Sequence, residues 1–320
     1  MKEKENSKKF IIGTHNGIFH NDEIIAISIL KVLLSEIKDI EIIRSRNIEF
    51  LKRNCQILID IGGGKFDHHQ KNGNGKRKNG ISYASAGLVW KKFGYLLIEK
   101  IIGNKLEENE KRKIFQKVDD DIMQKIDMED NGEKVDSHPF EFISSFLPNW
   151  IEQTPNYDEK FEEALDCASK VLNNYIKKIV AEELSKKELK SRINNKNTRI
   201  DNMLIIPSQT MPWKEMLVTY NYENENSPID FVIFPYPAGG YALQCVPPTL
   251  EEEFEQRIKL PNDWAGETEN LSHISGVKTA ILCHNGRFCA RAKEMNDILL
   301  LGKIATSNFE KEIEKTRIRK

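Results

Sequence analysis

The sequence predicts an α/β fold with a parallel sheet, followed by a smaller α+β domain. Three observations support this prediction. Near the N-terminus, short apolar runs alternate with helical segments, which is the pattern of a parallel sheet with crossover helices. A chain of 320 residues is long for one hydrophobic core, so two domains are expected. The last third differs from the first, because it holds a series of strand-like runs.

The elements of the first domain can be justified in order. Apolar runs and helical spacing predict strands at 10–13, 41–43 and 57–61, and helices at 22–34 and 47–54. The Gly-, Lys- and Asn-rich stretch 71–80 predicts a mobile loop. A helix is expected to begin near Ser82 or Ser85, since either hydroxyl can cap it, and to run toward Ile98. More helix is expected over 105–128.

Proline and other turn-forming residues between 146 and 156 predict the domain transition. Apolar residues at helical spacing from Phe161 to Ile179 then predict a long helix over 156–198. This helix is expected to connect a catalytic domain at 10–150 with a C-terminal domain at 199–310. In the C-terminal domain we expect strands at 204–206, 231–234, 241–246 and 280–283, and a helix at 293–304.

Composition limits the classes of partner and compartment. The net charge of −1 gives no global attraction to nucleic acid or acidic membranes, so a polyanion site must be a local basic surface. The five cysteines include no CxxC pair, which predicts reduced thiols. No apolar run reaches the length of a membrane span, and the first residues lack the apolar region of a signal peptide and contain acids, which is atypical of a mitochondrial presequence. We therefore expect an intracellular protein of the cytoplasm, the nucleus or both, rather than of mitochondria. The oligomeric state stays open.

Imidazoles and carboxylates gather after two of the predicted strands. The residues that follow these strands are His15, His20, Asp22, Asp60, Asp67, His68 and His69. The carboxyl ends of parallel strands meet at one edge of a sheet, and oxygen ligands mixed with imidazole suit Mn²⁺ or Mg²⁺. A further acid is expected from 126–132, where Asp127 and Asp130 are alternatives. Only Cys55 lies near the cluster, which disfavours a structural zinc site.

Each of these residues alone is more often a loop histidine or a turn-forming acid. Together they are hard to explain by packing, because four of the seven histidines fall between positions 15 and 69. Two-metal phosphoester hydrolysis requires several such ligands on a rigid rim, with one carboxylate between the ions. The joint pattern therefore predicts a two-metal hydrolase.

Six motifs occur in an order that resembles a known family. They are GTHNGIFHNDE, ILIDIGG with FDHHQ, YASAGLVW, IDMEDNG, PWKE and LPNDWAG. In this combination the chain, from about residue 10 to 305, resembles the Myg (melanocyte proliferating gene) family of DHH-type metal-dependent hydrolases, whose eukaryotic members act as RNA exonucleases.

The resemblance implies a DHH fold: a parallel-sheet catalytic domain, a long connecting helix and a smaller C-terminal domain, with the active site in the cleft between the domains. It also implies roles for the clustered residues. His15, His20 and Asp60 would hold one ion, and Asp22, Asp60, His68 and an acid of 127–130 would hold the other. His69 would face the scissile phosphate, and Asp67 would orient its neighbours.

The chain departs from the family near its C-terminus. The family's Gly-rich segment is replaced by a stretch with Arg287, Arg291 and Lys293, which are candidates for phosphate contacts or, equally, for a solvated strand face. Trp213 is a candidate for stacking on a base, with a core position at least as expected. The basic run Lys76–Lys78 is a weaker candidate for a nucleic-acid contact.

We therefore expect a 3′–5′ exonuclease that uses two Mn²⁺ or Mg²⁺ ions and acts on single-stranded RNA or a short oligonucleotide, without a membrane partner. One alternative is a hydrolase of small phosphates such as pyrophosphate. Another is a family member that binds metal or RNA without catalysis.

Overall fold

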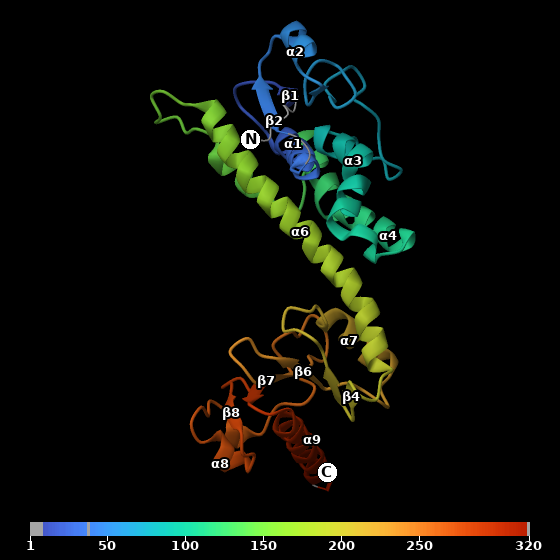
Figure 1. Ribbon diagram of the computed structural model, residues 1–320, viewed down its shortest axis with the longest axis vertical. Coiled ribbons are helices and arrows are strands. Elements are labelled where there is room, and N and C mark those ends of the chain that lie inside the picture. The colour runs from blue at the N-terminus through green and yellow to red at the C-terminus, as the bar shows by residue number, and fades with distance from the viewer. Residues whose placement is uncertain (1–8, 37–38, 319–320) are drawn as a thin grey trace, which may run out of the picture. The chain divides into compact units, whose positions relative to one another are not determined.

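The computed structural model describes residues 9–36 and 39–318, which divide into one unit ending at Val180 and another beginning at Ala181 (Figure 1). The division falls inside one helix, α6 (Tyr157–Ile193), which corresponds to the long helix that the spacing predicts. Each unit is described separately below.

The first unit contains a small parallel sheet in the order β2-β1-β3. Its strands are β1 (Phe10–Thr14), β2 (Ile40–Arg44) and β3 (Ile57–Leu58), joined through α1 (Asn21–Leu34) and α2 (Ile48–Asn54). The parallel sheet of an α/β fold is confirmed. The third strand is shorter than expected, because the backbone of Asp60 takes a left-handed conformation with φ of 56°.

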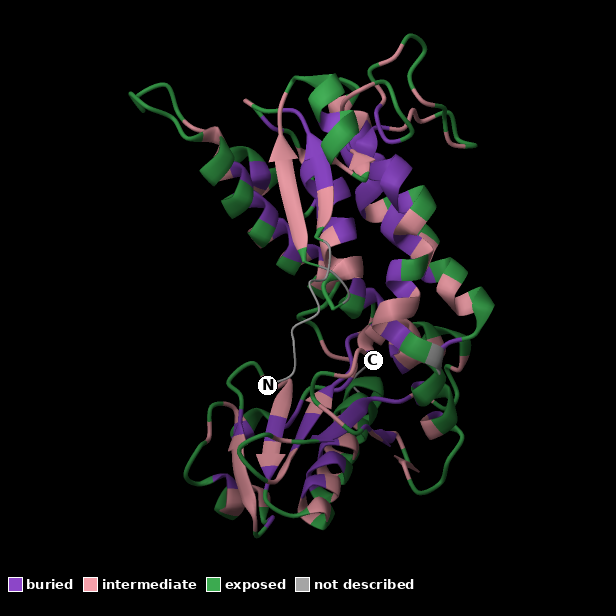
Figure 2. Cartoon of the chain, turned by 45° about the horizontal axis from the view of Figure 1, so that its top comes forward, coloured by how far each residue is buried: buried purple, intermediate pink, exposed green. Residues whose placement is uncertain are grey.

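Helix α1 is buried on nearly all sides, as its continuous apolar run predicts. It packs against α3 (Ser85–Ile102), which begins at the second of the two expected capping serines. In Figure 2 buried residues follow α1 and α3, and a buried stripe alternates with exposed residues along the first half of α6. The stripe comprises Phe161, Leu165, Ala168, Leu172 and Ile176.

The helix expected over 105–128 is not continuous. It consists of α4 (Glu108–Val118), a π-helical turn (Asp119–Met123) and α5 (Gln124–Asp130). Such π turns carry an extra residue and are often found at functional sites. Short 3-10 turns follow α3, at Gly103–Lys105, and precede α6, at Glu141–Phe146.

The second unit is built on a mixed sheet in the order β4-β5-β6-β7-β9-β8. Its strands are β4 (Arg199–Ile200), β5 (Met203–Ile205), β6 (Phe231–Pro235), β7 (Tyr241–Cys245), β8 (Ala280–Cys283) and β9 (Cys289–Ala292). The four expected strands are confirmed. Strands β4 and β9 escaped prediction, since β4 has two residues and β9 carries Arg291 in its middle.

Helices cover both faces of this sheet. They are α7 (Lys214–Glu223), α8 (Leu271–Ser275) and α9 (Met295–Ile318), with a 3-10 turn at Asn262–Trp264. Phe231 and Ile233 face the core that contains residues of α8 and α9, and Val232 faces the core that contains residues of α7 and the end of α6. Burial on both faces explains why β6 is apolar without alternation. Helix α9 continues well past the predicted end at 304.

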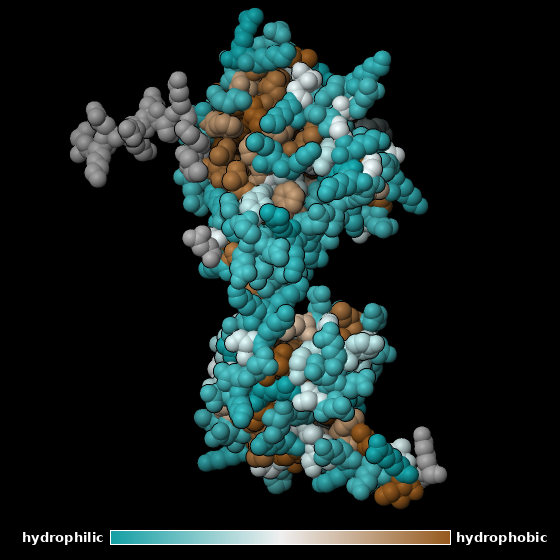
Figure 3. All heavy atoms as spheres, turned by 90° about the vertical axis from the view of Figure 1, so that its right-hand side faces the viewer, coloured by the Kyte–Doolittle hydropathy of each residue, from teal (hydrophilic) through white to brown (hydrophobic). Residues whose placement is uncertain are grey.

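All five cysteines are free, as their spacing predicts. The face of the molecule in Figure 3 is mainly hydrophilic, with hydrophobic atoms gathered in patches on each unit. None of the helices in the described part of the chain combines the length and the apolar character that a membrane crossing needs.

Candidate active site

The site lies where β1 and β3 end. His15 directly follows β1, and Asp60 follows β3, which pairs with β1 in parallel register. Asp60 is buried and central: its Oδ2 lies 3.3 Å from His15 Nε2, and its Oδ1 lies 3.4 Å from His68 Nε2 and 3.3 Å from His69 Nδ1. The left-handed backbone at Asp60 turns the chain so that one carboxylate reaches all three imidazoles, a strain of the kind found at functional sites.

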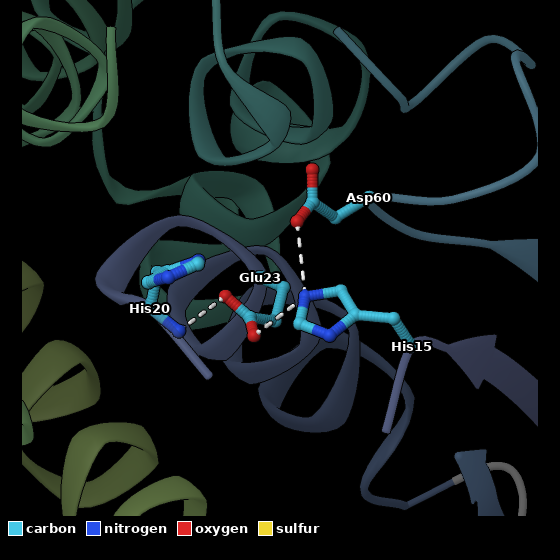
Figure 4. A group of neighbouring side chains, drawn as sticks. All are labelled: His15, His20, Glu23 and Asp60. Carbon is cyan, nitrogen blue, oxygen red and sulfur yellow. Dashed lines mark hydrogen bonds and ion pairs between the residues drawn. The ribbon is translucent and has the colours of Figure 1, made fainter. Parts of the chain in front are cut away.

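Helix α1 contributes the second set of donors from its first turn. His20 is the N-cap, and the Glu23 carboxylate accepts a hydrogen bond from the His20 backbone N–H at 2.8 Å. The other Glu23 oxygen lies 3.1 Å from His15 Nε2. Figure 4 shows the Glu23 carboxylate between His20 and the His15 ring, with Asp60 in contact with the same ring nitrogen as Glu23. Donor atoms of His15, His20, Glu23 and Asp60 lie within 4.8 Å of one another.

Two further groups of donors overlap with this one. Asp60, His68 and His69 form one, and His20, Asp22 and Asp130 form the other, each with donor atoms within 4.8 Å. His68 Nε2 lies 2.8 Å from Asp130 Oδ2 and 3.8 Å from Asp22 Oδ2. Because Asp60 and His20 each belong to two groups, the donors form one continuous cluster.

The donor set fits divalent cations. Asp22 Oδ1 is buried and has no hydrogen-bond partner among the described residues, whereas Glu23 Oε1 and His68 Nε2 are buried and face His15 and Asp130, at 3.1 and 2.8 Å. An unsatisfied buried oxygen is costly, and a cation bound there would remove that cost. Carboxylate oxygens combined with imidazole nitrogens are typical ligands of Mn²⁺ and Mg²⁺.

The electrostatics of the cluster point the same way. Burial raises the pKa of the Asp22 carboxyl well above its usual value, and the charges of Asp60, Glu23 and Asp130 raise it further. Burial lowers the pKa values of His15 and His68, but their close contacts with Asp60, Glu23 and Asp130 outweigh it and raise both to about 10. The carboxylates therefore create a strong preference for positive charge at this position.

Asp67 and His69 are arranged differently from the other members. Asp67 is buried and accepts hydrogen bonds from the backbone N–H groups of Gly63 and His69, at 2.6 and 3.0 Å. Its Oδ1 also lies 3.0 Å from His69 Nδ1. The His69 side chain is 62% exposed. The His69 ring is thus held at one nitrogen while its other edge remains accessible.

The structure separates the two acids that the sequence leaves as alternatives. Asp130 joins the cluster, whereas Asp127 does not: it is fully buried, binds Arg77 Nη1 at 2.7 Å and accepts from the Gly87 backbone N–H at 2.9 Å. Burial raises the pKa of Asp127 to about 7, against the opposing effect of Arg77. The Arg77 side chain is likewise buried, which does not support the weaker candidate role of this residue in nucleic-acid contact.

The substrate-binding candidates of the second unit differ in accessibility. Trp213 is 6% exposed and packs in the core beneath α7, so a base-stacking role is not supported. The Arg291 guanidinium lies over the Tyr236 ring at 3.6 Å and donates to the Gly239 carbonyl. Arg287 donates to the Leu260 carbonyl, and Lys293 is exposed. The three basic residues therefore do not form a shared group in the manner of the histidine and acid cluster.

Two members of the site escaped the sequence analysis. Glu23 was not among the predicted ligands, although the neighbouring Asp22 was. The position of Glu23, three residues after the N-cap, is typical of a side chain that folds back toward the cap. Ser85 donates its hydroxyl to Asp60 Oδ1 at 2.9 Å and its backbone N–H to Asp22 Oδ2 at 3.2 Å. The sequence predicts a capping role for Ser85, but Ala84 is the N-cap of α3 and the Ser85 hydroxyl instead reaches the distant strand end.

Two hollows flank His20 and His69. One, of about 420 Å³, is lined by the cluster and by Phe19, Ile143 and Leu147. The other, of about 590 Å³, is lined by the cluster and by Ile48, Gln70 and Arg46. His69 thus lies between two hollows, one with Leu147 in its lining and the other with Arg46.

Comparison with known proteins decides the family. The model of the MYG1_exonuc family, described as "Uncharacterised protein family (UPF0160)", matches residues 11–306. The chain belongs to this family. It is 29% identical to the human "MYG1 exonuclease" over 87% of this chain and 80% of that protein. It is 31% identical to a "MYG1 protein" of Saccharomyces cerevisiae over 92% of this chain and 95% of that protein.

Among solved structures, RecJ of Thermus thermophilus in complex with Mn²⁺ matches with a TM-score of 0.25 and 10% identity. The match covers 93% of this chain and 52% of the RecJ chain, so the chain spans about half of that protein's length. The expected Myg family membership is confirmed by the family model. The expectation of a hydrolase of the exonuclease type agrees with the names of the mammalian relatives.

Proposed function

We propose that this MYG1-family chain is a metal-dependent phosphoesterase that acts as a 3′–5′ exonuclease on single-stranded RNA, with two Mn²⁺ or Mg²⁺ ions. The observation that carries the proposal is the continuous cluster around Asp60, which includes the buried and unpartnered Asp22 Oδ1. The names of the mammalian relatives support nuclease activity. The choice of RNA and the polarity rest on the family resemblance.

The residues divide into two ligand sets that share Asp60. In this proposal His15, His20, Glu23 and Asp60 hold one ion, and Asp22, Asp60, His68 and Asp130 hold the other. Glu23 is added to the set that the sequence predicts, and Asp130 replaces the open choice between two acids. When bound, such ions lower the pKa of a coordinated water and stabilise charge on phosphoryl oxygens.

His69 and Asp67 supply the contact with the scissile phosphate. The Asp67 carboxylate lies 3.0 Å from His69 Nδ1, so it can accept a proton held there and fix the ring orientation. When the ring carries a second proton, the exposed Nε2–H can donate to a phosphoryl oxygen and stabilise its charge in the transition state. Asp67 is thus a positioning residue, and His69 is the group that touches substrate.

The two hollows favour an oligonucleotide over a small phosphate. Arg46 is exposed in the second hollow and forms no ion pair with the residues that the structure describes, so its guanidinium is available to a neighbouring phosphate. In the first hollow, Leu147 is partly exposed and offers an apolar contact for a base or sugar. A nucleotide chain can occupy both hollows, whereas pyrophosphate occupies only the centre.

The test is a substrate panel with Mn²⁺: end-labelled single-stranded RNA and DNA, a dinucleotide and pyrophosphate. We expect oligomers to be preferred, and Arg46→Gln to raise KM for oligomers while leaving the rate on a dinucleotide unchanged. Arg53→Gln is the matched control, because Arg53 is an exposed arginine of α2 outside the hollow. Turnover of pyrophosphate alone would instead identify a small-phosphate hydrolase, and metal uptake without any turnover would identify a binding protein.

A further inference from the structure

Arg77 lies in the loop after the histidine pair, but its side chain is only 6% exposed. Its Nε and Nη2 atoms donate to the two oxygens of Asp119, each at 2.9 Å, and its Nη1 donates to Asp127 Oδ2 at 2.7 Å. One guanidinium therefore binds two buried or nearly buried carboxylates, the first of them through a bidentate fork. Its flat face lies over the Tyr83 ring at 4.4 Å.

We propose that Arg77 is a positioning residue of the metal centre, which it orders through Asp127 and Asp119. The inference rests on the proposed function, because it assigns a support to the ligands Asp130, Asp60 and Asp22. It also gives Arg77 a role other than the candidate nucleic-acid contact of the basic run.

The first link runs through α5. Asp119 opens the π-helical turn, and Asp127 lies in the following α5, so Arg77 fixes both ends of this irregular segment. Asp130 is three residues after Asp127, which places the two side chains on one face of the helix. The same rotation of α5 about its axis therefore directs Asp127 to Arg77 and Asp130 to His68. Asp130 Oδ2 lies 2.8 Å from His68 Nε2.

The second link runs through the first turn of α3. Asp127 Oδ1 accepts from the Gly87 backbone N–H at 2.9 Å, and in the same turn Ser85 donates to Asp60 and Asp22. A Cβ atom at Gly87 would lie 1.8 Å from Asp127 Oδ2 and 2.6 Å from Arg77 Nη2. This close approach shows that α3 is seated directly against the Arg77–Asp127 pair. Both links lead from Arg77 to ligands of the cluster.

The neighbours of Arg77 support the assignment. Lys76 and Lys78 are exposed, whereas Asn79 extends the network: Asn79 donates to Gln124 Oε1 at 2.7 Å, and Gln124 donates to Asp119 Oδ2 at 3.3 Å. A nucleic-acid contact requires a guanidinium that faces solvent. The Arg77 guanidinium is buried and binds two carboxylates, so it instead fixes the positions of the segments that carry them.

The test measures Mn²⁺ binding to Arg77→Met by isothermal titration calorimetry, with Lys78→Met as the matched control. Changes to residues that orient metal ligands reduce metal affinity by about 10- to 100-fold, and we expect a loss in this range for the ion held by Asp130. We expect Lys78→Met to bind as the wild type does. Circular dichroism establishes that each variant is folded. A role confined to global stability would lower the unfolding midpoint and leave the affinity of the folded protein unchanged, which would overturn the inference.

Arg77→Met leaves Asp119 and Asp127 without their partner and can fail to fold for that reason. A second variant tests the inference in that case. In Arg77→Met/Asp119→Asn/Asp127→Asn the buried charges are removed together, and the amide oxygen introduced at position 127 can still accept from the Gly87 backbone N–H. We expect this variant to fold and to bind Mn²⁺ as weakly as the single variant should. Wild-type affinity in either folded variant would overturn the inference. A wild-type protein that binds no Mn²⁺ would overturn the proposed function, and the inference with it.

Discussion

His68 Nε2 lies 2.8 Å from Asp130 Oδ2, although His68 belongs to the loop after β3 and Asp130 ends α5. Burial lowers the pKa of His68, but the contacts with Asp130 and Asp60 outweigh it and raise the pKa to about 10, so a protonated imidazole holds the positive charge beside the Asp130 carboxylate. A divalent cation that displaces the proton would find both ligand atoms already close to each other. This relationship distinguishes Asp130 from Asp127, whose oxygens are bound by Arg77 and Gly87.

Replacing Asp130 should therefore weaken metal binding. We expect Asp130→Asn to lower the affinity for Mn²⁺ at least tenfold, which corresponds to about 1.4 kcal/mol. The measurement is calorimetric titration with Mn²⁺. Glu133→Gln serves as the control, because Glu133 is an exposed acid just beyond α5. Equal affinities for the two variants would exclude Asp130 from the ligand set.

Metal affinity should rise with pH. His15 and His68 have pKa values raised to about 10, against 6.5 for an ordinary histidine, so both imidazoles are protonated near neutral pH until a cation displaces the protons. We expect about a tenfold gain in affinity per pH unit for each displaced proton. Calorimetry in buffers of different ionisation enthalpy counts the protons released, and zero release between about pH 6.5 and 7.5 would contradict the prediction.

The same shifts determine how the metal-free protein responds to pH. A raised histidine pKa stabilises the folded state fully below the unfolded value of 6.5, and this contribution is lost as pH rises toward 10. Denaturation with urea at about pH 6 and pH 9 in the presence of a chelator should thus show a lower free energy of unfolding at the higher pH. An equal or higher value at the higher pH would show that the two imidazoles are not held in their charged form.

Gly87→Ala should destabilise the first unit. The added Cβ would overlap Asp127 Oδ2 and displace it from Arg77. Breaking a buried ion pair costs about 3–5 kcal/mol, and we expect a loss of that order in the free energy of unfolding. Gly64→Ala is a suitable control, since a Cβ at that position would have open space within 4 Å and the backbone φ there is not positive. A stability equal to that of Gly64→Ala would show that the contact can relax.

Trp213→Ala should act on stability rather than on substrate binding. Trp213 packs with Leu217 and Val232 in a buried core of the second unit, and removing a large core aromatic costs about 3–5 kcal/mol. Chemical denaturation measures the loss, and Trp213→Phe should lose less stability than Trp213→Ala. A change in KM for RNA with unchanged stability would restore the stacking role.

Regular elements could be predicted where the sequence has one dominant period. The apolar run of α1, the spacing along α6 and the strand-like residues of β6 each depend on local pattern and burial, so all three were predictable. The π turn at Asp119–Met123 was not, because its hydrogen-bond pattern depends on the pairing of Asp119 with Arg77, which no local period records.

The site was predictable in composition but not in connectivity. His15 and Asp60 could be brought together from the sequence, because adjacent parallel strands end at one edge of a sheet. The choice of Asp130 over Asp127 depends on the rotation of α5, and the inclusion of Glu23 depends on how its side chain folds back on the N-cap of α1. Both are properties of tertiary packing.

The most direct test of the metal-centre account is the digestion of end-labelled single-stranded RNA with Mn²⁺, with wild type beside Asp60→Ala. Asp60 contacts three histidines of the cluster, so its removal should abolish both ligand sets. The account predicts a stepwise product ladder from the wild type and none from a folded Asp60→Ala protein. A ladder of equal rate from Asp60→Ala would contradict it.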